Sequence, residues 1–186
     1  AEPLISDLSY LPFGPATGLK HAHGVSETPS YDLDYRLSSL SIAGEHRVLS
    51  RTYSYDPNSN IIDIDEANQA FIDQLFAYDA LDRLDTATGQ YGDISYDYDP
   101  VGNRLERTIE KGNDLTTETY SPLAQSNRLD RVDIDLNSQS QARVFSYDPK
   151  GNIVSEIFDG QTTQIAYSAM NRPTTWTRGE QSVSYT

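Results

Sequence analysis

The sequence predicts an all-β fold made of tandem antiparallel hairpins, and two observations carry this prediction. A tyrosine, most often followed by Asp, returns every 18–27 residues, and apolar and polar residues alternate in front of it. The mean interval is about 22 residues, a period typical of repeat architectures. We therefore expect residues 1–186 to form one repeat region. Its nine repeats begin near Tyr10, Tyr31, Tyr55, Tyr78, Tyr98, Tyr120, Tyr147, Tyr167 and Tyr185.

The residues before each of these tyrosines are typical of a strand with one apolar face. An apolar residue lies two positions before the tyrosine in seven of the nine repeats, and the residue between them is small or polar, as in Phe145-Ser146-Tyr147. Pro29 and Glu118 are the exceptions. Alternation with a period of two places the tyrosine on the buried face of the strand.

The residues after the tyrosine predict a tight turn. Tyr98 and Tyr147 are followed by Asp-Pro-x-Gly-Asn, in which Pro presets φ, Gly allows positive φ and Asp can accept bonds from backbone amides. A second strand follows, and the spacing of three in Leu37-x-x-Leu40 indicates a bulge in it. We expect a looser connection of variable length to the next repeat. Only residues 65–75, which begin with two acids, predict a short helix.

Composition narrows the possible functions. Leu, Ile, Val and Phe make up only 40 of the 186 residues, so the 13 tyrosines must contribute to the core. The net charge of −14 argues against binding to nucleic acid or to an anionic membrane. The absence of Cys excludes disulfides and thiolate ligands, and no apolar run is long enough for insertion into a membrane.

The repeated pattern Tyr-Asp-x-x-Gly-Asn/Arg-Leu resembles the YD repeats of the RHS family, from about Leu8 to Thr186. That family includes bacterial polymorphic toxins, the toxin-enclosing subunits of insecticidal Tc complexes and animal teneurins. The resemblance implies a curved sheet of hairpins that forms part of a hollow β-shell around a toxin or another polypeptide. It also implies a bacterial protein that is secreted or lies at the cell surface. The repeat-defining residues would be Tyr31, Asp32, Tyr55, Asp56, Tyr78, Asp79, Tyr98, Asp99, Gly102, Tyr147, Asp148 and Gly151.

Nine hairpins, with strands ~4.8 Å apart, would form a ribbon about 80 Å wide, which is too short to close a shell. We therefore expect this chain to be a fragment of a larger YD-repeat polypeptide. The expected partners are the rest of that polypeptide and an enclosed toxin domain.

The sequence predicts no enzyme, no cofactor and no metal site. It lacks the local motifs of serine hydrolases, phosphate-binding loops and zinc proteases. The Asp that follows five of the tyrosines, at Asp32, Asp56, Asp79, Asp99 and Asp148, is better explained as a repeated turn former than as a catalytic acid. His21 and His23 could present two metal ligands, but the sequence indicates no third ligand for them. The segment 133–137, Asp-Ile-Asp-Leu-Asn, begins like a calcium loop but lacks its glycine and final glutamate.

An alternative function is a surface adhesion or carbohydrate-binding module, because sugars stack on aromatic rings. The candidate glycan contacts are the aromatic residues outside the repeat register, Tyr35, Tyr91 and Trp176.

Overall fold

The computed structural model describes residues 4–45, 47–67 and 73–185. In these residues the chain forms seventeen strands and no helix. It divides into two compact units, residues 1–92 and 93–186. The strands of the first unit are β1 (Ile5–Tyr10), β2 (Ala16–His21), β3 (Ser26–Tyr31), β4 (Leu37–Gly44), β5 (Arg47–Tyr55), β6 (Ile61–Glu66), β7 (Gln74–Tyr78) and β8 (Leu84–Gly89). Those of the second are β9 (Gly92–Tyr98), β10 (Arg104–Lys111), β11 (Asp114–Pro122), β12 (Leu129–Leu136), β13 (Gln139–Tyr147), β14 (Ile153–Phe158), β15 (Gln161–Tyr167), β16 (Pro173–Arg178) and β17 (Gln181–Ser184).

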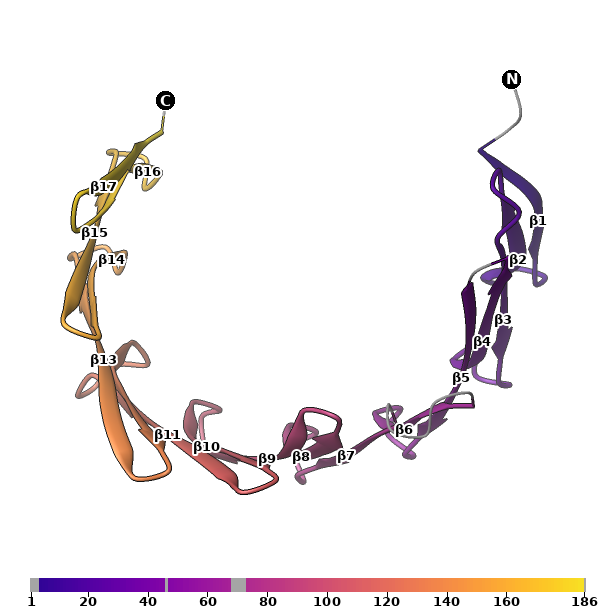
Figure 1. Cartoon of the computed structure of the whole chain (residues 1–186), viewed down its shortest axis with the longest axis horizontal. Helices are drawn as coiled ribbons and strands as arrows, with labels where there is room; N and C mark the ends of the chain where they lie inside the picture. The colour runs from indigo at the N-terminus through magenta and orange to yellow at the C-terminus, as the bar shows by residue number, and fades with distance from the viewer. Residues whose placement is uncertain (1–3, 46, 68–72, 186) are drawn as a thin grey trace. The chain divides into compact units, whose positions relative to one another are not determined.

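Each unit is a meander in which every strand pairs antiparallel with the next one along the chain (Figure 1). The same rule holds from β9 to β17. The predicted all-β fold of tandem antiparallel hairpins is therefore confirmed. Such a sheet depends on contacts between neighbours in sequence, as repeat proteins do.

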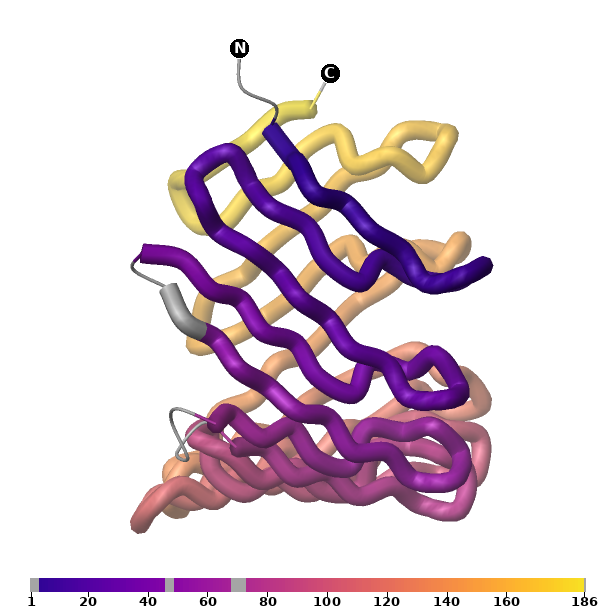
Figure 2. The backbone as a smooth tube through the Cα atoms, turned by 90° about the vertical axis from the view of Figure 1, so that its right-hand side faces the viewer, coloured from indigo at the N-terminus to yellow at the C-terminus, as the bar shows by residue number. Residues whose placement is uncertain are grey.

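The connections at the two ends of the strands differ in length. The loops after the tyrosines are the longer ones, which is the reverse of what was expected. Five residues, 99–103, separate β9 from β10 after the repeat tyrosine. At the other end of the strands in the second unit, only two residues join neighbouring strands, as in Asn137-Ser138 and Asp159-Gly160. All four of those residues have positive φ, which type I′ hairpin turns require. Figure 2 shows the chain running back and forth through β1–β5.

A bulge lies just after each tyrosine loop, as predicted for the strand that begins at Leu37. Tyr147 pairs with Ile153 while Ser146 pairs with Ser155, so Val154 is the extra residue. The same shift occurs in the hairpins of Tyr10, Tyr31, Tyr55, Tyr78, Tyr98 and Tyr167. The bulge explains the spacing of three, because it brings residues on both sides of it to the face that carries the tyrosine.

The tyrosine-bearing face of the sheet, called the tyrosine face below, is only half-buried, which corrects the predicted buried face. The alternation itself is right: Tyr53 and Tyr55 are partly covered and Ser54 between them is exposed. Among the described residues, however, the only buried apolar side chains are Ala87 and Val132, at 4% and 6% exposure. Within each unit the sheet is a single layer, so the rings are covered by their strand neighbours alone.

The predicted helix over residues 65–75 is wrong at both ends. Asp65 and Glu66 close β6, and Gln74 and Leu75 open β7. Residues 68–72, the middle of the predicted helix, lie outside the described residues. Strand pairing overrides the helix propensity of this segment, because Asp65 and Glu66 pair with β5.

Candidate functional site

The loop after each repeat tyrosine is closed by its aspartate, in an arrangement we call the aspartate clasp. In the clasp of Asp148, Oδ1 accepts hydrogen bonds from the backbone N–H of Lys150 and of Asn152, both at 2.9 Å. Oδ2 accepts from the side-chain amide of Asn152 at 2.8 Å. The Asp148 N–H donates to the Asn152 carbonyl, and the Gly151 N–H donates to the Asp148 carbonyl, each at 3.0 Å.

The same geometry recurs four more times among the described residues, at Asp32, Asp56, Asp79 and Asp99. The residue three positions after the aspartate has positive φ, which Gly102 and Gly151 adopt at 93° and 92° without strain. The aspartate therefore acts as a turn former, since its oxygens satisfy the amides that the loop leaves unpaired.

Hydrogen bonds to the carboxylate lower the pKa of all five clasp aspartates. The side-chain amide of the following Asn is the largest cause for Asp56, Asp99 and Asp148, and desolvation opposes it. For Asp79 the largest cause is the backbone N–H of Arg83. For Asp32 desolvation is the largest single influence and raises the pKa, but the bonds from Arg36 together outweigh it.

These shifts predict that the protein loses stability in acid. Because the folded-state pKa of each clasp aspartate lies below its unfolded value of about 3.9, the stabilisation is complete above about pH 5 and disappears as the pH falls through the folded-state pKa values. We expect the melting temperature to fall between pH 5 and about pH 2. The Asp148→Asn variant should lose part of this slope. Glu180→Gln, an equal change of charge at an exposed hairpin position, should retain it. Equal slopes for all three proteins, followed by circular dichroism, would contradict the role of the clasps.

Neighbouring loops after the repeat tyrosines are joined by side-chain hydrogen bonds. Asn60 Nδ2 donates to Asp82 Oδ1 of the next loop at 2.8 Å. Arg36 Nη1 donates to Ser59 Oγ at 3.1 Å, and Asn152 Nδ2 to Asn171 Oδ1 at 3.3 Å. In each case the last residue of one loop donates to the residue with positive φ in the next loop. Side-chain hydrogen bonds of this kind therefore link neighbouring loops in each unit.

The repeat tyrosines tie the strands together on the tyrosine face. The hydroxyl of Tyr55 donates to the Leu37 carbonyl at 2.7 Å, and that of Tyr147 to the Leu129 carbonyl at 2.6 Å. Tyr31, Tyr78 and Tyr167 make the equivalent bond. In each hairpin the ring therefore reaches the first residue of the preceding strand, and its hydroxyl finds the partner that a half-buried phenol requires.

Arginines and glutamates fill the gaps between the rings. The guanidinium of Arg36 lies 4.7 Å from the ring centroid of Tyr55. Arg51 Nε and Glu66 Oε2 form an ion pair of 2.8 Å in which the Glu66 side chain is only 3% exposed. Arg107 Nη2 and Glu118 Oε1 form another, of 2.6 Å. The tyrosine face thus combines aromatic rings with shielded charge pairs.

The repeat around β9–β12 departs from this pattern. The hydroxyl of Tyr120 donates to Glu118 Oε2 instead of to a backbone carbonyl. Burial of Tyr120 raises its pKa to about 12, helped by the bond to Glu118. Arg104 is the first residue of β10 and carries its guanidinium 4.3 Å from the ring centroid of Tyr120.

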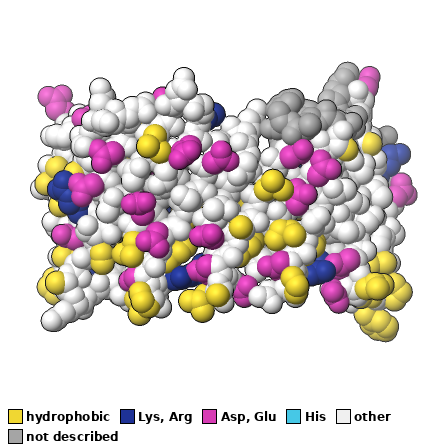
Figure 3. All heavy atoms as spheres, turned by 90° about the horizontal axis from the view of Figure 1, so that it is seen from below, with side chains coloured by type: hydrophobic (Ala, Val, Ile, Leu, Met, Phe, Trp, Pro, Cys, Tyr) yellow, Lys and Arg dark blue, Asp and Glu magenta, His cyan; other side chains and the backbone are white. Residues whose placement is uncertain are grey.

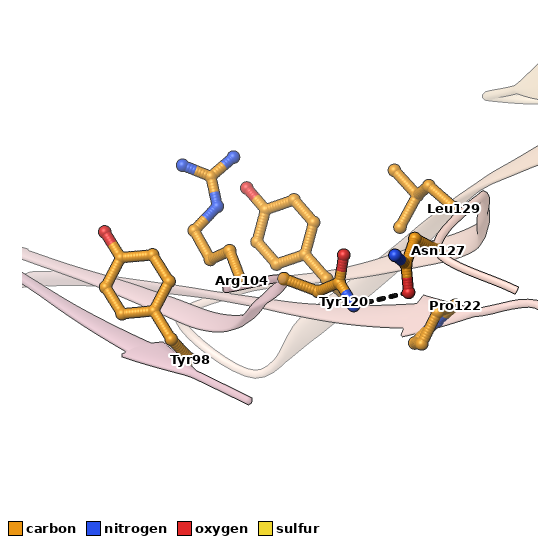
Figure 4. A pocket seen from close by; sticks show the side chains of 7 residues that line it. Tyr98, Arg104, Tyr120, Pro122, Asn127 and Leu129 are labelled. Atoms are coloured by element: carbon orange, nitrogen blue, oxygen red, sulfur yellow. Dashed lines mark hydrogen bonds between the residues drawn. The ribbon is translucent and has the colours of Figure 1, made fainter. Parts of the chain in front are cut away.

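A pocket of about 270 Å³ opens beside Arg104 (Figure 4). Figure 4 shows the guanidinium between the rings of Tyr98 and Tyr120, directed away from the sheet. The rest of the lining comes from Asn103, Pro122, Asn127 and Leu129. Asn103 Nδ2 donates to Asn127 Oδ1 at 3.2 Å, the bond drawn as a dashed line.

The three candidate glycan contacts lie in different elements of the chain. Tyr35 lies in the loop between β3 and β4, and its hydroxyl donates to the Pro12 carbonyl at 3.3 Å. Tyr91 lies in the turn between β8 and β9, at the end of the strands that does not carry the tyrosine loops. Trp176 belongs to the second unit, in β16, where it pairs with Ile165 and Val183. Carbohydrate binding by these residues remains a prediction.

The histidines and acids form no metal cluster in the part of the chain that the structure describes. His21 ends β2 and pairs with Glu27, Nε2 to Oε1 at 2.8 Å, whereas His23 is exposed in the next turn. Figure 3 shows Asp and Glu side chains spread over the visible face, with few Lys and Arg among them. This distribution matches the net charge of −14 and makes the surface unfavourable for anionic polymers.

Sequence reasoning missed the two charged clusters on the tyrosine face. Glu118 is visible in the sequence as a charged residue at an apolar repeat position, and Arg104 stands where most repeats have an aliphatic residue. A comparison of the repeats position by position would therefore have marked both residues.

Comparisons with known proteins support the fold. The crystal structure of TcdB2-TccC3-TEV matches 98% of this chain and 12% of that chain, at 17% sequence identity and a TM-score of 0.51. Crystal structures of TcdB2-TccC3-Cdc42 and TcdB2-TccC3 match 87% of this chain and 12% of theirs, at 14% identity and TM-scores of 0.35 and 0.37. No family model matches the chain, and no curated protein does. The first likeness shows that the hairpin sheet occurs as a small part of a much longer chain.

Proposed function

We propose that this chain is a non-catalytic wall segment of a larger YD-repeat protein of the RHS family, which encloses a toxin or another polypeptide. The observation that carries the proposal is the repeated aspartate clasp. It occurs five times among the described residues, and in four of these hairpins the tyrosine-to-carbonyl bond accompanies it. Repetition of one structural device from hairpin to hairpin serves the continuity of a sheet. A catalytic site, in contrast, needs groups that converge on one place.

Two further observations support the proposal. The described part of each unit is a single layer with almost no buried apolar side chain, which suits a wall better than a self-contained domain. The structure that shares the fold, TcdB2-TccC3-TEV, is about eight times as long as the matching region. The nine repeats from Tyr10 to Tyr185 would then be one stretch of such a wall.

The proposed partners and location follow from the family resemblance. The partners are the remainder of the YD-repeat polypeptide and the enclosed polypeptide, and the protein is bacterial and either secreted or at the cell surface. No helix in the described residues is long and apolar enough to cross a membrane.

The proposal is tested on the natural full-length polypeptide that contains this sequence. Limited proteolysis should leave a segment outside the repeats intact in the native protein and cleave it rapidly after unfolding in urea. An Asp99→Ala/Asp148→Ala variant, with two clasps opened, should expose that segment, and the exposed-site variant Glu180→Gln should not. A natural polypeptide in which every segment outside the repeats is cleaved at the unfolded rate would refute enclosure.

A further inference from the structure

Arg104 occupies a position in the repeat that the fold does not reserve for a charge. The equivalent residue, which follows the last residue of the clasp, is aliphatic in the other four clasp repeats. These residues are Leu37, Ile61, Leu84 and Ile153. Each of these aliphatic residues pairs with the repeat tyrosine of its hairpin, so an arginine is not needed at this position to build the hairpin.

Arg104 also lacks the carboxylate partner that Arg51, Arg107 and Arg143 have on this face. Its Nε is buried without a hydrogen-bond partner, and no ion pair of the described residues includes Arg104. The Nε atoms of Arg107 and Arg143 are similarly placed, but these arginines contact Glu118 and Glu156. The polar contacts of Arg104 are with aromatic rings, those of Tyr120 at 4.3 Å and Tyr96 at 5.8 Å.

Both oxygens of the nearby glutamate already have other partners. Glu118 Oε1 is paired with Arg107, and Glu118 Oε2 accepts a hydrogen bond from the Tyr120 hydroxyl. Arg104, Arg107 and Glu118 together therefore carry one excess positive charge on a chain whose net charge is −14. A shielded cation of this kind interacts most favourably with an anion that brings hydrogen-bond acceptors.

We infer that the pocket beside Arg104 binds a monocarboxylate carried on a small apolar or aromatic body. The guanidinium offers the paired N–H groups that match the two oxygens of a carboxylate. The rings of Tyr98 and Tyr120 and the side chain of Leu129 offer an apolar wall. A volume of about 270 Å³ lies just below the range of sites for drug-sized ligands, so it fits a molecule of the size of benzoate. One uncommitted cation favours a monoanion over a phosphate dianion. This site does not depend on the proposed wall function.

The inference is tested by titrating the protein with benzoate and with benzamide, its neutral isostere, and following the ¹⁵N resonance of Arg104 Nε. We expect saturable benzoate binding with a Kd in the millimolar range, because the pocket is open and small. Benzamide should bind at least about tenfold more weakly. High salt should weaken the benzoate complex, because it screens the ion pair.

Variants separate this site from general attraction to the protein. Arg104→Leu restores the residue type of the other repeats, so it should fold with an unchanged circular dichroism spectrum and lose benzoate binding. Arg104→Lys keeps the charge without the paired donors and should bind several-fold more weakly. Arg131→Gln removes an exposed arginine and should bind as the unmodified protein does. Equal binding of benzoate and benzamide, full binding by Arg104→Leu, or an equal loss in Arg131→Gln would overturn the inference.

Discussion

Replacing Tyr147 by Ala should lower the free energy of unfolding by about 3 kcal/mol. The half-buried ring contributes about 2 kcal/mol through the apolar area it removes from water. The hydroxyl bond to the Leu129 carbonyl, 2.6 Å long, contributes about 1 kcal/mol. Tyr147→Phe should therefore lose about 1 kcal/mol, because it keeps the ring beneath the guanidinium of Arg128. Urea unfolding followed by circular dichroism measures both changes.

Tyr10 provides the control for this prediction. It also ends a strand before a loop, but its side chain is 63% exposed. Tyr10→Ala should lower the free energy of unfolding by about 0.5 kcal/mol, as expected of an exposed side chain. A loss for Tyr147→Ala no larger than that for Tyr10→Ala would mean that the rings do not hold the hairpins together.

The hairpins were predictable because their signals are local. The alternation around Tyr53 and Tyr55 and the spacing from Leu37 to Leu40 each lie within a few residues, and both have the predicted structural outcome. The relative lengths of the two connections were not predictable in this way. The aspartate clasp needs a five-residue loop so that one carboxylate can reach the amides two and four positions later. The length of the loop therefore depends on side-chain hydrogen bonds, which the turn propensities of the residues do not include.

The partners within the charged clusters could not be predicted, because the pairing depends on the register between strands. Arg51 and Glu66 are directly opposite each other in β5 and β6, and the bulge after Tyr55 decides this pairing. A shift of one residue would send Glu66 to the opposite face. The expected helix failed for the same reason, because a cross-strand partner for Glu66 outweighs the helical preference of its neighbours.

Removing Arg51 from the Arg51–Glu66 pair should be as damaging as removing Tyr147, and removing Glu66 should be somewhat less damaging. Arg51→Ala removes the ion-pair partner of the Glu66 carboxylate, which is 3% exposed and keeps a hydrogen bond from the Ser50 N–H at 3.1 Å. A buried charge without its partner is strongly unfavourable, so we expect a loss of about 3 kcal/mol. Glu66→Ala should lose about 2 kcal/mol, since the Arg51 side chain is 33% exposed and can still reach water. Both losses are measured by urea unfolding.

A double substitution distinguishes the value of the pair from the penalty of breaking it. In Arg51→Met/Glu66→Met no buried charge is left unpaired, so most of the lost stability should return even though the ion pair is absent. The exposed pair of Arg131 and Asp133, at 45% and 42% exposure, is the control, and Arg131→Ala should leave the free energy of unfolding nearly unchanged. If the double variant were no more stable than Arg51→Ala, the ion pair itself would stabilise the sheet. The tyrosine face would then rely on charge pairs in the same way as on its rings, because a single layer has no second sheet to shield them.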